Sequence, residues 1–256
     1  MPFAIRNRTA LASVFAALSL GALAAPKDLK NCVAITEPGS YVLTRNITAT
    51  SDCFVIQADF VTLDLAGFVI TGNGGGAGIA EFLGAGHQGI VVRNGAVTNF
   101  QDAIALPHST AVTVEAVNAT GNSFDGIVLG DEATVKNSTV ASNGGMGMRL
   151  GQRALVTGNN VNANAGSGIL VDIGGNVAGN TVGRNQASGI VAFEGALLVN
   201  NVSRNNMLDG ISVDCPSAVI SNTTSNNQGQ NLDMISGACD PNSQACCVVT
   251  AHNSTL

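Results

Sequence analysis

The chain has 256 residues, of which 31 are glycine, 11% are charged, 4% are aromatic and 45% are hydrophobic. The hydrophobic share excludes a disordered chain, and because the sequence has no tryptophan and one tyrosine, its core must be aliphatic. A net charge of −6 and the absence of any basic run argue against nucleic acid as a partner.

The N-terminus has the pattern of a secretory signal. Arg6 and Arg8 precede an apolar stretch that ends in Ala22-Leu23-Ala24, which has the A-x-A form of a cleavage site. The stretch is shorter than the about 20 apolar residues that a membrane anchor needs. We therefore predict that residues 1–24 are a signal peptide and that the mature chain, with a charge of −8, is secreted or periplasmic without membrane insertion.

The cysteines gather near the two ends of the mature chain: Cys32, Cys53, Cys215, Cys239, Cys246 and Cys247. An even number in an exported protein predicts disulfides, and the spacings and scarce histidines are not those of a zinc site. We expect the first two to pair and close an N-terminal cap of residues 25–52. The other four are expected to pair among themselves in a C-terminal cap or tail of residues 234–256, with their connectivity left open.

The middle of the chain is a repeat. From residue 125 it divides every 21 residues into segments that begin DGIVL, MGMRL, SGILV, SGIVA and DGISV, and a looser copy, DAIAL, begins at Asp102. A fixed period of this length is typical of a solenoid, and apolar residues that alternate after each glycine indicate strands. We predict an all-β parallel β-helix of about seven coils over residues 53–233, with three short strands per coil. One residue of each coil is expected to form an inner stack: Ile104, Ile127, Met148, Ile169, Ile190 and Ile211.

Asparagine recurs at one place in each coil: Asn99, Asn122, Asn143, Asn164, Asn185, Asn206 and Asn227. A second column holds Asn159, Asn180, Asn201 and Asn222, with Ser138 above them. Asparagine tolerates tight bends, and its amide can bond to the coils above and below. We interpret both columns as structural ladders, with a row of sugar-binding amides as the alternative.

The repeat segments VAGNTVGRNQASGIVAF, LLVNNVSRNNMLDGISV and AVISNTTSNNQGQNLDM carry a family resemblance. So does the lead-in CVAITEPGSYVLTRNITATSDCFVIQADFVTLDLAGFVITGNG. Over nearly all of Asn31 to Asp233, the sequence resembles the right-handed parallel β-helix proteins of the pectate-lyase-like superfamily. The resemblance implies right-handed coiling. It leaves function open, because the superfamily includes lyases, hydrolases, epimerases and adhesins.

In that superfamily, a polysaccharide groove commonly follows the outer face of the first strand of each coil. The charged residues on this face and in the turn after it form the densest candidate cluster: His108, Asp131, Arg149, Arg153, Asp172 and Glu194. Carboxylates there can act as acid and base or hold calcium, while an arginine can abstract a proton or stabilise an enolate. The competing interpretation is a solvated rim whose charges serve solubility. No lyase, hydrolase or epimerase motif of the family is recognisable, so catalytic residues stay unassigned, and calcium is the one cofactor considered.

The sequence therefore favours an exported glycan-interacting protein without a clear catalytic motif. One alternative is a polysaccharide lyase or hydrolase. Another is a non-catalytic surface or adhesion scaffold that binds a protein partner, because Val128, Leu170 and Val191, with Phe193 beside them, would form an apolar stripe on the outer face. The scarcity of tryptophan and tyrosine, on which sugars commonly stack, argues for a neutral glycan or none.

Overall fold

The computed structural model describes residues 25–82, 84–235, 248–250 and 254–255. The predicted signal peptide, as well as Cys239, Cys246 and Cys247, lies outside these residues. In the described part the regular structure consists of strands alone, and no helix there is long and apolar enough to span a membrane.

One row of strands forms a ten-stranded parallel sheet. Its members, in order, are β2 (Val33–Ile35), β5 (Phe54–Ile56), β8 (Ala77–Glu81), β10 (Asp102–Leu106), β12 (Ile127–Leu129), β15 (Met148–Leu150), β18 (Ile169–Val171), β21 (Ile190–Ala192), β24 (Ile211–Asp214) and β27 (Leu232–Ile235).

A 19-stranded sheet contributes two further rows, which share the long strands β9 (Val91–Thr98) and β11 (Thr113–Thr120). The other members of its first row are β1 (Lys27–Leu29), β3 (Gly39–Leu43), β6 (Val61–Asp64), β13 (Thr134–Lys136), β16 (Leu155–Thr157), β19 (Asn176–Ala178), β22 (Leu197–Val199), β25 (Ala218–Ile220) and β28 (Val248–Thr250). Those of its second row are β4 (Ile47–Thr48), β7 (Val69–Thr71), β14 (Thr139–Ala141), β17 (Asn160–Asn162), β20 (Thr181–Gly183), β23 (Val202–Arg204), β26 (Thr223–Ser225) and β29 (Ser254–Thr255).

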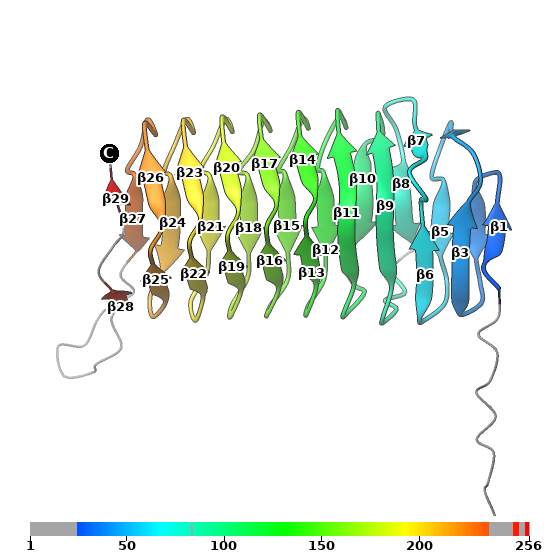
Figure 1. The fold of residues 1–256 in the computed structure, drawn as a ribbon, viewed down its shortest axis with the longest axis horizontal. Helices are drawn as coiled ribbons and strands as arrows, with labels where there is room; N and C mark the ends of the chain where they lie inside the picture. The colour runs from blue at the N-terminus through cyan, green and yellow to red at the C-terminus, as the bar shows by residue number, and fades with distance from the viewer. Residues whose placement is uncertain (1–24, 83, 236–247, 251–253, 256) are drawn as a thin grey trace, which may run out of the picture.

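Successive coils add strands to the three rows and stack along a single axis (Figure 1). The partners in β12 and β15 are 21 residues apart, and the same register continues through the repeat. The predicted all-β solenoid with about 21 residues per coil is confirmed. The number of coils is about ten rather than seven, because residues 27–48, expected to form a cap, already contribute strands that pair in parallel with the coils after them.

The core is aliphatic, as the composition requires. All six members of the predicted inner stack are 0% exposed. Valines of the other two rows, such as Val135 and Val140, face them and are equally buried. Full burial of one such side chain contributes about 1.5 to 3 kcal/mol, so the stacked columns are the main stabilising feature of the fold.

Asparagine amides join the coils at one corner. The six asparagines of the column from Asn122 to Asn227 form a ladder. From the second member on, each Oδ1 accepts hydrogen bonds from the backbone N–H and the side-chain amide of the asparagine in the previous coil. Asn99 differs from this expectation, because Phe100 lies at the ladder position and its N–H donates to Asn122. The turn from Thr98 to Ile104 is one residue shorter than the turn from Thr120 to Ile127, so Asn99 falls one place early.

The second column forms a matching ladder at the corner between the other two rows. The N–H of Ser138 donates to Asn159, and the same bond repeats through Asn180, Asn201 and Asn222. These side chains are buried, so they meet backbone hydrogen-bonding needs inside the coil and are not exposed to a ligand.

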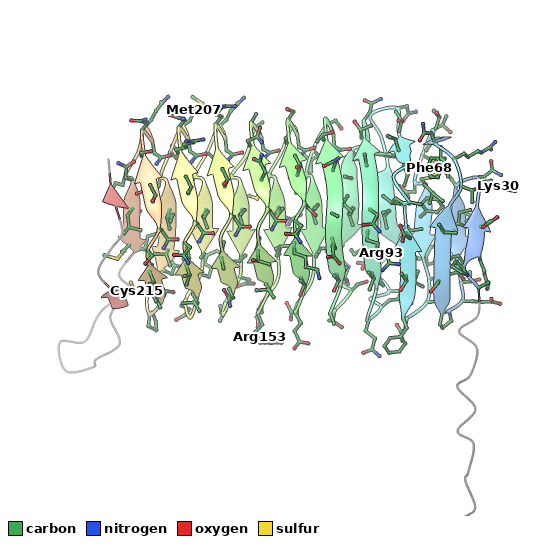
Figure 2. The ribbon with its side chains drawn as sticks, viewed as in Figure 1. Lys30, Phe68, Arg93, Arg153, Met207 and Cys215 are labelled. Carbon is green, nitrogen blue, oxygen red and sulfur yellow. A yellow bond between two sulfur atoms is a disulfide. The ribbon has the colours of Figure 1, made fainter. Side chains whose placement is uncertain are left out.

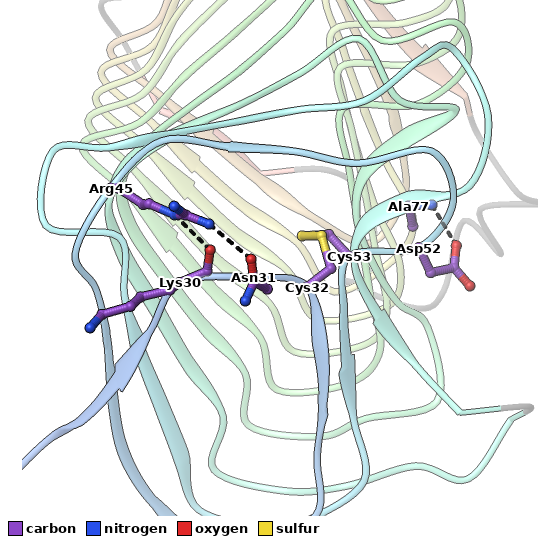
Figure 3. The surroundings of a disulfide bond; sticks show 7 residues. All are labelled: Lys30, Asn31, Cys32, Arg45, Asp52, Cys53 and Ala77. Atoms are coloured by element: carbon purple, nitrogen blue, oxygen red, sulfur yellow. Dashed lines mark hydrogen bonds between the residues drawn. A yellow bond between two sulfur atoms is a disulfide. The ribbon is translucent and has the colours of Figure 1, made fainter.

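A disulfide joins the first two coils, as predicted: Cys32 is bonded to Cys53 (Figure 3). The two residues are 21 apart in sequence, one coil length, and their Cα atoms are 4.4 Å apart, which is close to the spacing of adjacent coils. Arg45 supports the same corner by donating to the Lys30 carbonyl and to Asn31. Cys215 is also disulfide-bonded.

Candidate functional site

The turns of each coil lie on two opposite edges of the solenoid. Figure 2 shows Arg153 on one edge and Met207 on the other. Arg153 belongs to the turns that follow the ten-stranded sheet, whereas Met207 belongs to the turns that precede it. Of the candidate residues, His108, Asp131, Asp172 and Glu194 lie on the edge of Arg153, and Arg149 lies in the middle of β15.

Most of the predicted residues on the Arg153 edge bond to a nearby residue rather than to one another. Asp131 accepts a hydrogen bond from the Gln152 N–H at 2.9 Å, and Asp172 accepts one from the Ile173 N–H at 2.7 Å. Arg153 forms an ion pair with Glu132 at 3.0 Å. Glu194 is exposed.

His108 on this edge pairs with Glu81, a carboxylate that also accepts a hydrogen bond from the Ser109 hydroxyl. Within the described residues, His108, Asp131, Arg149, Arg153, Asp172 and Glu194 make no hydrogen bond or ion pair with one another, and no group of three His, Cys, Asp or Glu residues is arranged to hold a metal ion.

Arg149 instead turns toward the opposite end of its strand. Its Nη2 lies 3.6 Å from Oδ2 of Asp125, a residue of the preceding coil that stands just before β12. The Asp125 side chain is only 4% exposed, whereas that of Arg149 is 52% exposed. The other oxygen of Asp125 accepts a hydrogen bond from the Met146 N–H at 2.7 Å. This carboxylate is therefore fixed by the backbone and presents one oxygen to the arginine.

A second carboxylate stands one coil earlier at the same position. Asp102 accepts a hydrogen bond from the Asp125 N–H at 2.9 Å. Burial raises the pKa of the Asp102 carboxyl, and the neighbouring Asp125 charge raises it further, against the lowering effects of the hydrogen bond and of Arg149. Two aspartates and one arginine from three successive coils thus form a compact charged cluster.

A hollow of about 450 Å³ adjoins this cluster, lined by Phe124, Asp125, Met146, Arg149, Ala165 and the glycines at 144, 145 and 166. Phe124 is 50% exposed. The glycines keep the hollow open and also allow close packing, since a Cβ on Gly145 would come 2.3 Å from the Asp125 carboxylate. An exposed aromatic ring and a buried carboxylate paired with an exposed arginine therefore share one concave surface.

The apolar stripe is interrupted. Val128 is 6% exposed, and Leu170 and Val191 are half-buried. Arg149 lies between Val128 and Leu170 in the register of the ten-stranded sheet, so the outward row is not a continuous apolar face. Phe193, in the turn after β21, is 38% exposed.

Asp102, Asp125 and Phe124 were not among the candidates drawn from the sequence. The signal for the aspartates was present, because they are the first letters of the copies DAIAL and DGIVL. The candidates occupy outward positions within each strand and in the turn after it, whereas Asp102 and Asp125 stand at the start of a strand or just before it. The partner of Arg149 follows only from the side-chain geometry.

We expect Asp102→Asn to stabilise the protein at neutral pH and to have less effect in acid. A raised folded-state pKa means that the wild type loses stability as pH rises from the ordinary value of 3.8 through the folded-state pKa. Asparagine keeps an oxygen for the Asp125 N–H but carries no charge. Urea unfolding of both proteins from pH 3 to 8 should show a stability difference that grows through this window and then levels off. A difference that is constant with pH would contradict the raised pKa.

The match to a family model agrees with this architecture. Residues 66–229 match the family model described as "Right handed beta helix region". No curated protein is detectably similar in sequence. Among solved structures, the A-module of Azotobacter vinelandii mannuronan C-5 epimerase AlgE4 is 18% identical, with a TM-score of 0.65, over 78% of this chain and 67% of that module. The A-module of AlgE6 from the same organism is 14% identical, with a TM-score of 0.49, over 90% and 89%.

Proposed function

The chain belongs to the family of right-handed β-helix proteins, and on that premise we propose that it binds a glycan on the outer face of its ten-stranded sheet, at the Phe124–Asp125–Arg149 hollow. The observation that carries this proposal is the combination of an exposed aromatic ring with an ordered polar pair at one concave surface. The hollow has a volume of about 450 Å³, which is in the range of small-ligand pockets.

The two kinds of side chain have complementary roles in this proposal. Phe124 offers an apolar face on which a sugar ring can pack. The guanidinium of Arg149 supplies several fixed donors for sugar hydroxyl or carboxylate oxygens, and Asp125 holds that guanidinium in place. Mannuronan C-5 epimerase AlgE4, whose A-module shares this fold, is named for a polysaccharide, which supports a polymer of sugars as the ligand class.

We expect Phe124→Ala and Arg149→Gln each to weaken glycan retention by about tenfold, corresponding to ~1.4 kcal/mol. Affinity electrophoresis against a panel of neutral and acidic polysaccharides, with and without calcium, measures the effect. Arg93→Gln is the matched control, because Arg93 is also half-exposed and paired with an aspartate, Asp64, but lies on the other sheet. The control should bind as the wild type does.

Equal loss of retention in Arg93→Gln and Arg149→Gln would contradict a site at the hollow. No retention of any polysaccharide by the wild type would also contradict it. If that result came with concentration-dependent self-association that Leu170→Asp abolished, the outer face would instead serve a protein partner.

A second candidate function is cleavage of the bound glycan by lyase or hydrolase chemistry. The observation that favours it is the raised pKa of Asp102 beside Asp125, since two carboxyls held in different environments are a common acid–base arrangement. New unsaturated or reducing ends in the same incubations, lost in Asp102→Asn while retention persists, would establish an enzyme. Retention without new ends supports a binding protein.

We also propose that this protein is secreted or periplasmic. The Cys32–Cys53 disulfide supports it, because structural disulfides persist in oxidising compartments. The N-terminal sequence pattern of residues 1–24 supports the same location.

A further inference from the structure

A second hollow lies on another face of the solenoid, over the second row of the 19-stranded sheet. It has a volume of about 140 Å³ and is lined by Asn160, Asn162, Thr181, Val182, Gly183, Arg184, Arg204 and Asn205. These residues come from β17, β20 and β23 and the turns after them. The lining contains two arginines and no carboxylate.

The two arginines are set side by side by the backbone. The N–H of Arg184 donates to the Arg204 carbonyl at 3.2 Å. Arg204 is in register with Gly183, the residue before Arg184, so the two side chains leave neighbouring coils one register position apart. Gly183 makes the hollow, because its register neighbours Asn162 and Arg204 carry side chains while it carries none. A Cβ at Gly183 would lie 3.6 Å from Cγ of Arg204, so the stem of this arginine borders the open space.

The side chains of Arg184 and Arg204 differ from those of the other arginines of residues 25–235, because they have no ion-pair or hydrogen-bond partner within the described part of the chain. Arg93, Arg149 and Arg153 each pair with a carboxylate of the preceding coil, and Arg45 bonds to Asn31. The side chains of Arg184 and Arg204 make no ion pair and no hydrogen bond with any described residue.

No acidic residue lines this hollow, in a chain whose acidic residues outnumber its basic ones by 17 to 11. The acidic residue in the turn after β23, Asp209, accepts a hydrogen bond from the Gln230 N–H and is not part of the lining. Two like charges on adjacent coils repel each other when nothing neutralises them. Arginine's planar fork matches the oxygens of sulfate, phosphate or carboxylate. Asn162 and Thr181, which carry an amide and a hydroxyl, line the same space, and the Asn162 amide uses one of its two hydrogens in a bond to Asn160. The pocket is thus complementary to a small group with several anionic oxygens.

We propose that the Arg184–Arg204 pocket binds an oxyanion, either as a free ion such as sulfate or as the sulfate ester of an acidic polymer. The pocket lies in a different row from the Phe124–Asp125–Arg149 hollow and does not depend on glycan binding there. Its ligand is anionic, and the guanidinium pair supplies the recognition.

Calorimetric titration with sodium sulfate, at an ionic strength held constant with chloride, tests this site. We expect saturable binding of one sulfate by the wild type and a loss of about tenfold or more in the double variant Arg184→Gln/Arg204→Gln, because both charge-assisted contacts disappear. Both arginines are exposed, so the variant should keep the wild-type melting temperature. Arg93→Gln, which removes one positive charge elsewhere, should leave sulfate affinity unchanged.

Wild-type and double-variant proteins that bind sulfate equally, or an Arg93→Gln loss as large as that of the double variant, would overturn the proposal. Retention on dextran sulfate but not on dextran, lost in the double variant, identifies the polymer ester as a ligand. Saturable sulfate binding without retention on dextran sulfate identifies the free ion as the ligand. Either result supports the oxyanion site. Phe124→Ala should bind sulfate normally, so failure of the glycan site is distinguishable from failure of this one.

Discussion

Replacement of Asn164 by leucine should destabilise the protein by about 3 to 5 kcal/mol, because it leaves several buried polar groups without partners at about 1 to 3 kcal/mol each. Asn164 is 0% exposed. Its Oδ1 accepts from the N–H and the side-chain amide of Asn143, and its Nδ2 donates to Asn185 and to the Val140 carbonyl. Leucine fills a similar volume but supplies none of these bonds. Urea unfolding followed by circular dichroism measures the change.

Asn176→Leu is the matched control for the ladder. Asn176 is half-buried in β19, and its register neighbours on both sides are already leucines, Leu155 and Leu197. The substitution should change stability by about 0.5 kcal/mol or less. If Asn164→Leu unfolded at the same urea concentration as this control, the ladder would contribute little to stability.

The repeat in the sequence was sufficient to predict the inner stacks, since each glycine is followed by a residue that faces the core. The first two coils were harder to predict because they lack the repeat glycine and carry a disulfide, which is typical of a cap. The 21-residue separation of Cys32 and Cys53 was nevertheless a sign of stacking, since two residues one coil apart lie directly above each other.

The positions of side chains between coils could be predicted only in part. Asn99 follows the column pattern in the sequence, yet a turn shorter by one residue places Phe100 in the ladder instead. Arg149 was expected to face the carboxylates that follow its strand, whereas it pairs with Asp125, which precedes β12. A periodic sequence specifies which residues share a column, but the direction of a long side chain depends on local charges and turn lengths.

Gly168→Ala should destabilise the protein by about 3 kcal/mol or more, although its added group is a single methyl. The backbone of Gly168 does not require glycine, since its φ is not positive. Space is the constraint: a Cβ would lie 2.5 Å from Cγ1 of Val182, 2.6 Å from the Gly189 carbonyl oxygen and 2.7 Å from the Asn185 amide nitrogen. That carbonyl accepts a hydrogen bond from the Ile169 N–H, so moving it strains the sheet. Gly75→Ala, whose Cβ would meet nothing closer than 3.7 Å, should unfold as the wild type does.

The chain itself contains the compensated form of this substitution. Ala103 takes the place of the repeat glycine in its coil. In the same coil, the position that corresponds to Val140 and Val182 of later coils holds the smaller Ala119. Val182→Ala should therefore relieve part of the clash in Gly168→Ala. In a double-mutant cycle, the two substitutions together should cost about 1 kcal/mol less than the sum of their separate effects. Strict additivity would show that the backbone contact with the Gly189 carbonyl, rather than the contact with Val182, excludes a side chain at Gly168.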